Sequence, residues 1–108
     1  MRVVFLGTPE IAVPSLRALH GAGHRIRLVV TGADKRRGRG GGTSPSPVKE
    51  AALALGLPVS HSVDDVLEVD AELGVVVAFG RIIRPHVLAR VPMVNVHFSL
   101  LPRWRGAA

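Results

Sequence analysis

Three short apolar runs restrict most strongly what this chain can fold into. Residues 3–6, 26–30 and 74–80 have the length of strands and are mainly apolar, with Arg27 as their one charged residue, and they lack the regular polar alternation of a sheet that has one face in solvent. Segments with helical spacing of apolar residues separate them, at residues 14–20 and 47–55. This alternation predicts a Rossmann-like, doubly wound α/β fold with a mostly parallel sheet.

The ends of the two main helices are marked by residues that favour starts and stops. Pro14 suits a first helical turn, and Gly21 or Gly23 supplies the stop. Ser46 and Pro47 are typical of an N-cap followed by the first helical position. We therefore expect helices near residues 14–20 and from residue 47 to just before a closing glycine at position 56.

The remaining elements are shorter. Residues 57–60 suit a short strand, Ser62 suits the cap of a short helix with an acidic residue three places later, and residues 85–89 suit a turn or helix. Residues 93–97 form the last predicted strand. Residues 31–46 are rich in glycine and arginine and lack periodicity, and loops of this length are usually functional or disordered.

Composition limits the class of protein. The 108 residues suit one small domain, and the absence of cysteine excludes disulfide frameworks and thiolate metal sites. The apolar run after Met1 is too short for a secretion signal, and no run could span a membrane, so we expect a cytoplasmic protein. No spacing of histidines or carboxylates indicates a metal site, and we expect no membrane and no stable protein partner.

The net charge of +6 is concentrated in two places. The six cations that account for it are Lys35, Arg36, Arg37, Arg39, Arg103 and Arg105. A local basic patch favours an anionic partner, although a solvated loop without a partner would have the same composition.

A dinucleotide site is excluded by the turn after the first strand. That turn reads Gly7-Thr8-Pro9 and lacks the glycine pattern that binds a pyrophosphate, and proline has no amide to offer a phosphate. The glycines of the 31–46 loop do not form a phosphate-binding loop either, because no Gly-Lys-Ser or Gly-Lys-Thr follows them.

Asn95 and His97 are the strongest candidates for chemistry. They alternate along a strand end, so both project from one face, while Val96 should point into packing on the other. An asparagine amide can donate to an oxygen that gains negative charge, and a histidine can share that work or move a proton. The pair therefore suits acyl transfer to an amine. The alternative is a pair of side chains that only satisfy loop backbone.

The segment that follows carries a resemblance to a known family. Residues 95–108 read Asn-Val-His-Phe-Ser-Leu-Leu-Pro-Arg-Trp-Arg-Gly-Ala-Ala, which resembles the signature of folate-dependent formyltransferases. Within that family the chain is most similar to the methionyl-tRNA formyltransferases, through Phe-Leu-Gly-Thr-Pro-Glu at residues 5–10, Gly-Arg-Gly at 38–40 and Pro-Ser-Pro-Val-Lys at 45–49. The resemblance covers the whole chain in order.

The resemblance implies a reaction and roles for particular residues. A formyl group would pass from 10-formyltetrahydrofolate to the amino group of methionine on initiator tRNA. Asn95 matches the asparagine that contacts the formyl oxygen, and His97 matches the catalytic histidine. The residues that match the folate site are Ser99, Leu100, Leu101 and Pro102, with Phe79, Gly80 and Ile82 as a wall of the pterin pocket. The residues that match the tRNA-contacting loop are Arg39, with Arg37, Arg36 and Lys35 beside it.

Two alternatives stay open. A sibling formyltransferase could act on glycinamide ribonucleotide, on a sugar amine or on water. The glycinamide enzymes usually carry a Gly-rich phosphate turn after the first strand, which Gly7-Thr8-Pro9 is not. The sugar and hydrolase relatives usually lack the combination of Gly-Arg-Gly with Pro-Ser-Pro-Val-Lys. A non-catalytic tRNA-binding remnant is the other alternative.

In the family, the catalytic aspartate and a C-terminal barrel lie beyond the position of Ala108. We therefore expect residues 1–108 to be the N-terminal part of the catalytic domain, with a sheet truncated at its C-terminal end and with weak or no activity alone.

Overall fold

The computed structural model describes residues 1–36 and 42–97. Its strands are β1 (Arg2–Gly7), β2 (Arg25–Val30), β3 (Lys35–Arg36), β4 (Thr43–Ser44), β5 (Val59–Ser60), β6 (Leu73–Val77) and β7 (Met93–Val96). Its α-helices are α1 (Val13–Gly21), α2 (Pro47–Ala54) and α3 (Pro85–Arg90), and its 3-10 helices are η1 (Glu10–Ala12) and η2 (Val63–Glu68).

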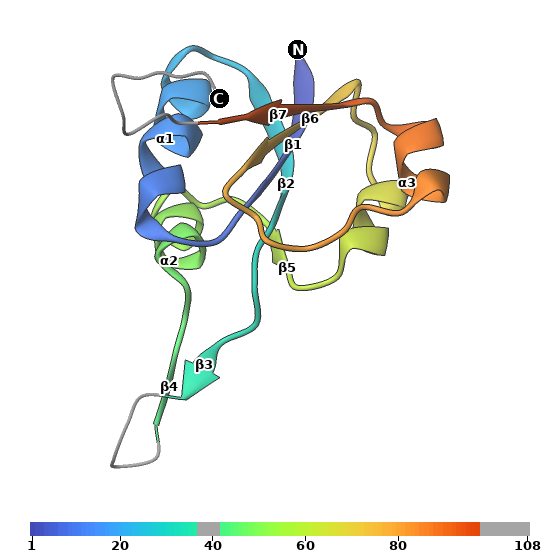
Figure 1. Ribbon diagram of the computed structural model, residues 1–108. Helices are drawn as coiled ribbons and strands as arrows, with labels where there is room; N and C mark the ends of the chain where they lie inside the picture. The colour runs from blue at the N-terminus through green and yellow to red at the C-terminus, as the bar shows by residue number, and fades with distance from the viewer. Residues whose placement is uncertain (37–41, 98–108) are drawn as a thin grey trace, which may run out of the picture.

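The main sheet confirms the predicted α/β class. Five strands lie in the order β5-β2-β1-β6-β7, and every pairing between them is parallel. From the central β1 the chain first moves outward to β2 and β5, then returns to place β6 on the other side of β1 (Figure 1). This reversal makes a switch point between β1 and β6, and ligands of such sheets bind beyond the carboxyl ends of the strands at that point.

Helices cover both faces of the sheet, as in a doubly wound fold. α1 and α2 lie on one face, where they pack with Val3 and Phe5 in the first core cluster (Figure 1). η2 and α3 lie on the other face, over Val4 and Leu6 in the second cluster. Because neighbouring residues of β1 point to opposite faces and all four are buried, the strand is apolar throughout.

The boundaries of the two main helices agree with the sequence. α1 carries a proline in its first turn and ends at Gly21, and α2 begins at Pro47. The Ser46 Oγ accepts a hydrogen bond from the Lys49 backbone N–H at 3.0 Å, which confirms the predicted N-cap. The same oxygen lies 2.6 Å from the Thr31 Oγ1, and both side chains are buried. This cap therefore joins α2 to the end of β2.

Removal of this cap tests how far it fastens the two elements. We expect Ser46→Ala to lower the free energy of unfolding by about 2 kcal/mol, because it removes a helix cap and leaves the buried Thr31 hydroxyl without its partner. Chemical denaturation of the chain measures this. The Thr31→Val/Ser46→Ala double variant should recover part of the stability lost in Ser46→Ala, since the orphaned hydroxyl is then gone. Equal stability of Ser46→Ala and wild type would contradict the assignment.

Three sequence expectations need correction. The 31–46 segment is not irregular throughout, because β3 and β4 pair as a short antiparallel hairpin that leads away from the sheet (Figure 1). The segment after Ser62 is a 3-10 helix, and the Ser62 side chain makes no cap bond. The strand expected over 74–80 ends at Val77, because Ala78 adopts a φ of 51° that turns the chain.

The expectation that Val96 points into packing is also wrong. Val96 is 37% exposed and Val94 is 45% exposed. Among the described residues β7 pairs only with β6 and forms an edge of the sheet, so its side chains have neighbours on one side only.

The amino-terminal edge of the sheet is held by a separate polar cluster. The Arg2 backbone N–H donates to the Glu72 Oε1 at 3.0 Å, and this bond, with the nearby Arg2 guanidinium, holds the pKa of Glu72 below its ordinary value. The Arg2 side chain also lies 3.4 Å from the Asp70 carboxylate. These groups lie where β1 and β6 begin, away from the carboxyl ends of the strands.

None of the described helices is long and apolar enough to cross a membrane.

Candidate active site and basic hairpin

A groove of about 370 Å³ opens at the carboxyl ends of β6 and β7. The residues that line it are Ile11, Val76, Ala78, Phe79, Gly80, Arg81, Asn95, Val96 and His97. They come from η1 after β1, from the turn after β6 and from the end of β7. The groove therefore lies at the switch point between β1 and β6, as the topology requires.

Asn95 and His97 both line this groove. Asn95 of β7 pairs with Val76 of β6 in the parallel sheet. Val76 packs in the core cluster under η2 and α3, so the Asn95 side chain projects from that same face of the sheet. His97 follows directly after the end of β7, and both side chains are exposed. Both are exposed because, among the described residues, β7 lies at the edge of the sheet. An exposed amide and an imidazole in one groove can reach a bound carbonyl group.

The turn after β6 supplies the apolar wall of the groove. The Phe79 side chain is buried and faces the groove at its edge, between Ala78 with a φ of 51° and Gly80 with a φ of 78°. These two left-handed residues fold the chain back sharply, and Gly80 does so without steric cost. Ile82, which the sequence placed in the same wall, is 86% exposed and does not line the groove.

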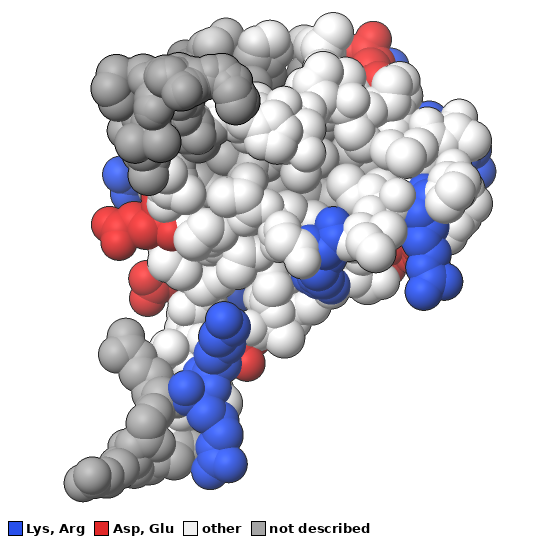
Figure 2. All heavy atoms as spheres, viewed as in Figure 1, with Lys and Arg blue, Asp and Glu red and all other residues white. Residues whose placement is uncertain are grey.

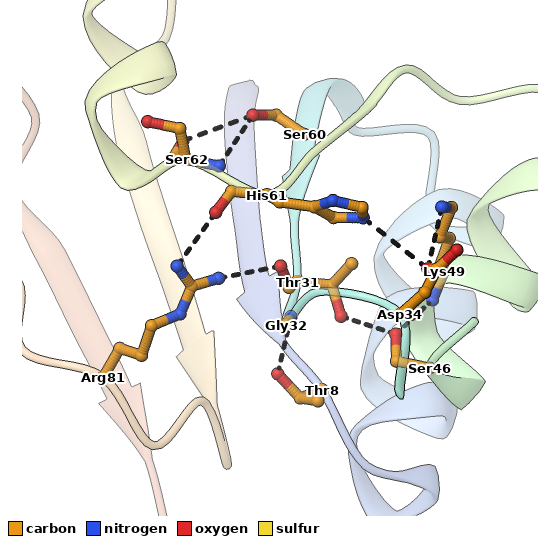
Figure 3. Close-up of polar contacts among 10 residues, drawn as sticks. All are labelled: Thr8, Thr31, Gly32, Asp34, Ser46, Lys49, Ser60, His61, Ser62 and Arg81. Carbon is orange, nitrogen blue, oxygen red and sulfur yellow. Dashed lines mark hydrogen bonds and ion pairs between the residues drawn. The ribbon is translucent and has the colours of Figure 1, made fainter. Parts of the chain in front are cut away.

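Arg81 lines the groove and was not identified from the sequence. Its guanidinium donates to the Thr31 carbonyl oxygen at 2.8 Å and to the His61 carbonyl oxygen at 2.9 Å (Figure 3). It also lies 4.8 Å from the centre of the Phe79 ring. Arg81 thereby ties the turn after β6 to the ends of β2 and β5, across the carboxyl end of β1. Ile11 was missed too, since no periodicity marks a residue of a 3-10 turn.

The antiparallel pair of β3 and β4, called the basic hairpin below, carries two of the predicted tRNA-contacting residues. Lys35 and Arg36 form β3 and are exposed, and Figure 2 shows Lys and Arg side chains along the arm that leaves the body of the molecule. The other predicted residues of this loop and of the folate loop lie outside the described residues. They are Arg37, Arg39, Ser99, Leu100, Leu101 and Pro102.

A second groove, of about 730 Å³, lies between the base of the hairpin and helices α1 and α2. Its lining includes Pro9, Glu10, Arg17, Lys35 and Ser44. Because Pro9 and Glu10 line this groove and the next residue along the chain lines the first, only the short η1 segment separates the two. Residues adjacent in sequence, at the start of η1, therefore line the two grooves.

Within residues 1–36 and 42–97, no group of three or more histidine, aspartate or glutamate side chains is arranged to hold a metal ion. The first groove offers an amide donor, an imidazole, the Arg81 guanidinium and an apolar wall.

The fold and the groove together define a class: a Rossmann-like α/β protein with polar groups for acyl chemistry at its switch point. The whole chain, residues 1–108, matches the sequence model of the formyl transferase family. The chain belongs to this family.

Relatives in bacteria share about half of the residues of this chain. A methionyl-tRNA formyltransferase of Heliobacterium modesticaldum is 55% identical over 100% of the chain, and one of Moorella thermoacetica is 52% identical over 100%. A third, of Synechococcus sp. RCC307, is 51% identical over 99%. The chain spans only 36–38% of the length of these relatives.

A solved structure has the same fold. The glycinamide ribonucleotide transformylase 1 of Geobacillus kaustophilus superposes with a TM-score of 0.64 over 97% of this chain and 62% of its own. The two share 18% sequence identity, so this likeness concerns the arrangement of strands and helices alone.

Proposed function

We propose that this chain is the N-terminal part of the catalytic domain of an enzyme that transfers a formyl group from 10-formyltetrahydrofolate to the amino group of methionine on initiator tRNA. The observation that carries the proposal is the groove that gathers Asn95, His97, Phe79 and Gly80 at the switch point. Relatives named methionyl-tRNA formyltransferase support this choice of substrate. Translation starts in the cytoplasm, which is the proposed location.

The groove suits the reactive end of a folate in size and in chemistry. Its volume of about 370 Å³ lies within the range of small-molecule sites, which are mostly apolar with a few polar groups. The Phe79 ring and the backbone of the turn around Gly80 would face a flat heterocycle. A bound 10-formyltetrahydrofolate supplies a carbonyl carbon that an amine can attack.

Asn95 and His97 have complementary roles in this transfer. A bond forms between the amine nitrogen and the formyl carbon, and the bond from that carbon to the folate nitrogen breaks. The amine loses one proton and the departing folate nitrogen gains one, so tetrahydrofolate is released. Asn95 would donate its amide hydrogen to the formyl oxygen as negative charge develops there. His97 would share in this stabilisation or accept the proton of the attacking amine.

The hairpin and the second groove fit an approach by the end of a tRNA. Lys35 and Arg36 are exposed where they can meet phosphates, which positions a nucleic acid without reading its sequence. Lys35 also lines the larger groove, and η1 carries residues that line each of the two grooves. We propose that a tRNA held at the hairpin extends its aminoacyl end past η1 to the reacting groups.

Substrate choice provides the direct test. The product of the complete reading frame should formylate methionyl initiator tRNA in the presence of 10-formyltetrahydrofolate. The same protein should leave glycinamide ribonucleotide and sugar amines unchanged. Transfer to either small amine but not to the tRNA would favour a sibling activity, and tRNA binding without transfer would favour a binding remnant.

The hairpin cations should govern tRNA affinity. We expect the Lys35→Ala/Arg36→Ala variant to bind initiator tRNA about 10-fold more weakly or worse near 0.1 M salt, because two phosphate contacts are lost. The slope of log affinity against log salt should become shallower by about 1.5 to 2. Fluorescence titration of a labelled tRNA at four salt concentrations measures both quantities.

A control with the same change in charge is available on the other face of the sheet. Arg84 and Arg90 lie at the two ends of α3 and are exposed, so Arg84→Ala/Arg90→Ala removes two charges away from the hairpin. This control should keep most of the affinity and most of the slope. Equal losses in both variants would mean that net charge, and not the hairpin, drives binding.

A further inference from the structure

Asp34 lies at the base of the basic hairpin, directly before Lys35. Its carboxylate Oδ1 is 2.9 Å from the Lys49 Nζ and 3.9 Å from the His61 Nε2 (Figure 3). The Asp34 side chain is 34% exposed and that of Lys49 is 21% exposed. The pair is therefore partly shielded from solvent, between the outgoing end of the hairpin and helix α2.

An acidic residue in this place opposes the role that we propose for the hairpin. It precedes a run of cations at positions 35, 36, 37 and 39, and its negative charge would repel the phosphates that those cations attract. Electrostatic attraction alone would therefore favour a neutral residue at position 34.

Lys49 holds both ends of the hairpin at once. Its ammonium group binds Asp34 at the outgoing end, and its backbone N–H donates to the Ser46 Oγ at the returning end. The Ser46 Oγ in turn contacts the Thr31 Oγ1, and the Gly32 N–H donates to the Thr8 Oγ1 at 3.1 Å. The base of the hairpin is thus fastened on both sides.

Beyond this base, the described part of the arm contains a short antiparallel ladder. Within the described residues β3 and β4 pair over two residues each, Lys35 with Ser44 and Arg36 with Thr43. So short a ladder is not stable by itself, and its direction depends on where its two ends are anchored. A small rotation at Asp34 would displace Lys35 and Arg36, which follow it directly along the chain.

We propose that Asp34 is a positioning residue for tRNA binding: its ion pair with Lys49 sets the direction in which the basic hairpin leaves the sheet. This inference rests on the proposed function, because it assumes that the hairpin meets tRNA. Exposed ion pairs add little to global stability, so the contribution of Asp34 should appear in binding and much less in unfolding.

The sign of the effect of Asp34→Asn distinguishes positioning from simple charge. Removal of a negative charge beside the cations would tighten tRNA binding if charge alone mattered. If Asp34 positions the arm, the Asp34→Asn variant should bind an initiator tRNA transcript about three- to tenfold more weakly than wild type. Asp70→Asn is the matched control, because it removes the same charge at the opposite edge of the sheet, and it should leave the affinity nearly unchanged.

A double-mutant cycle identifies the partner. Lys49→Met should weaken binding to a similar extent, and the Asp34→Asn/Lys49→Met double variant should be no weaker than either single variant, since all three lack the same contact. Asp34→Glu, which keeps the carboxylate, should recover part of the affinity. Unfolding curves recorded beside each titration should show that all variants remain folded.

The outcomes separate the two proposals. Affinity equal to or tighter than wild type in Asp34→Asn, with clear weakening in Lys35→Ala/Arg36→Ala, would overturn the positioning role and leave the proposed function intact. No weakening in either variant would overturn both the hairpin's role in tRNA binding and the inference built on it. Weakening in both, with non-additivity in the cycle, supports both.

Discussion

His97→Ala is expected to lower kcat/KM for formyl transfer by about 10²–10⁴-fold, measured on the product of the complete reading frame. His97 lines the groove at the end of β7 and carries an imidazole, a group that can accept and donate a proton. An alanine there removes that function without leaving a cavity in the core, because the His97 side chain is exposed. Initial rates with 10-formyltetrahydrofolate and methionyl initiator tRNA give the comparison.

Two variants on the same strand make this test specific. Asn95→Ala should lower the rate by about 10²–10³-fold, since it removes one donor to the developing oxyanion. Val94→Ala changes a side chain that is 45% exposed and does not line the groove, and it should keep nearly full activity. Folate binding should persist in all three. Near-normal transfer by His97→Ala would remove His97 from the proposed mechanism.

The sheet could be predicted because its strands are apolar on both faces. Residues 3–6 and 74–77 have no position at which polar side chains could face water, and only a covered parallel sheet buries such runs. Pro14 and the Ser46-Pro47 pair marked helix starts through local chemistry alone. Structural features that depend on adjacent residues, such as helix starts, can be predicted from a single sequence.

Features that depend on distant contacts were not predicted. Arg81 follows a glycine in a loop, and nothing near it in the sequence indicates that it reaches the carbonyl oxygen of Thr31, fifty residues away. The β3–β4 hairpin has no alternating pattern, because two-residue strands are too short to show one. Val96 was expected to be buried because the residue pattern of a strand does not show whether that strand lies at the centre or at the edge of a sheet.

The candidate site was predicted in part. Asn95 and His97 share a groove with Phe79 and Gly80, and this follows from the rule that parallel strands present their carboxyl ends at one edge. Ile82 was assigned to the same wall by its place in a motif, but the turn at Ala78 and Gly80 directs the chain away before Ile82 is reached. A motif gives the order of residues along the chain, whereas the left-handed turn decides which of them face the groove.

Gly7→Ala is expected to lower the free energy of unfolding of the chain by about 3 kcal/mol, at the upper end of the usual cost of overpacking. A Cβ at this position would lie 2.7 Å from the backbone oxygen of Val77 and 3.0 Å from both the Ala12 Cβ and the Phe5 Cε2. The Val77 carbonyl belongs to the neighbouring strand and cannot rotate away as a flexible side chain could. The strand β6 or the η1 segment must therefore shift.

Gly21→Ala is the matched control, with the same added methyl and an opposite expected sign. Gly21 is the last residue of α1, and a Cβ there would meet no atom within 4 Å. Alanine restricts the unfolded chain and suits a helix better, so this variant should gain about 0.5 kcal/mol or more. Chemical denaturation of both variants beside wild type provides the measurement, and a Gly7→Ala variant as stable as wild type would contradict the close approach of β1 to β6.

The same substitution should also reach the groove, because Val77 is the last residue of β6 before the turn that carries Phe79. A shift of β6 would move that turn relative to Asn95 on β7. We therefore expect the folded fraction of Gly7→Ala, in the product of the complete reading frame, to bind folate more weakly than wild type, while Gly21→Ala binds it equally well. Loss of stability with unchanged folate affinity would mean that η1, and not β6, gives way to the added methyl.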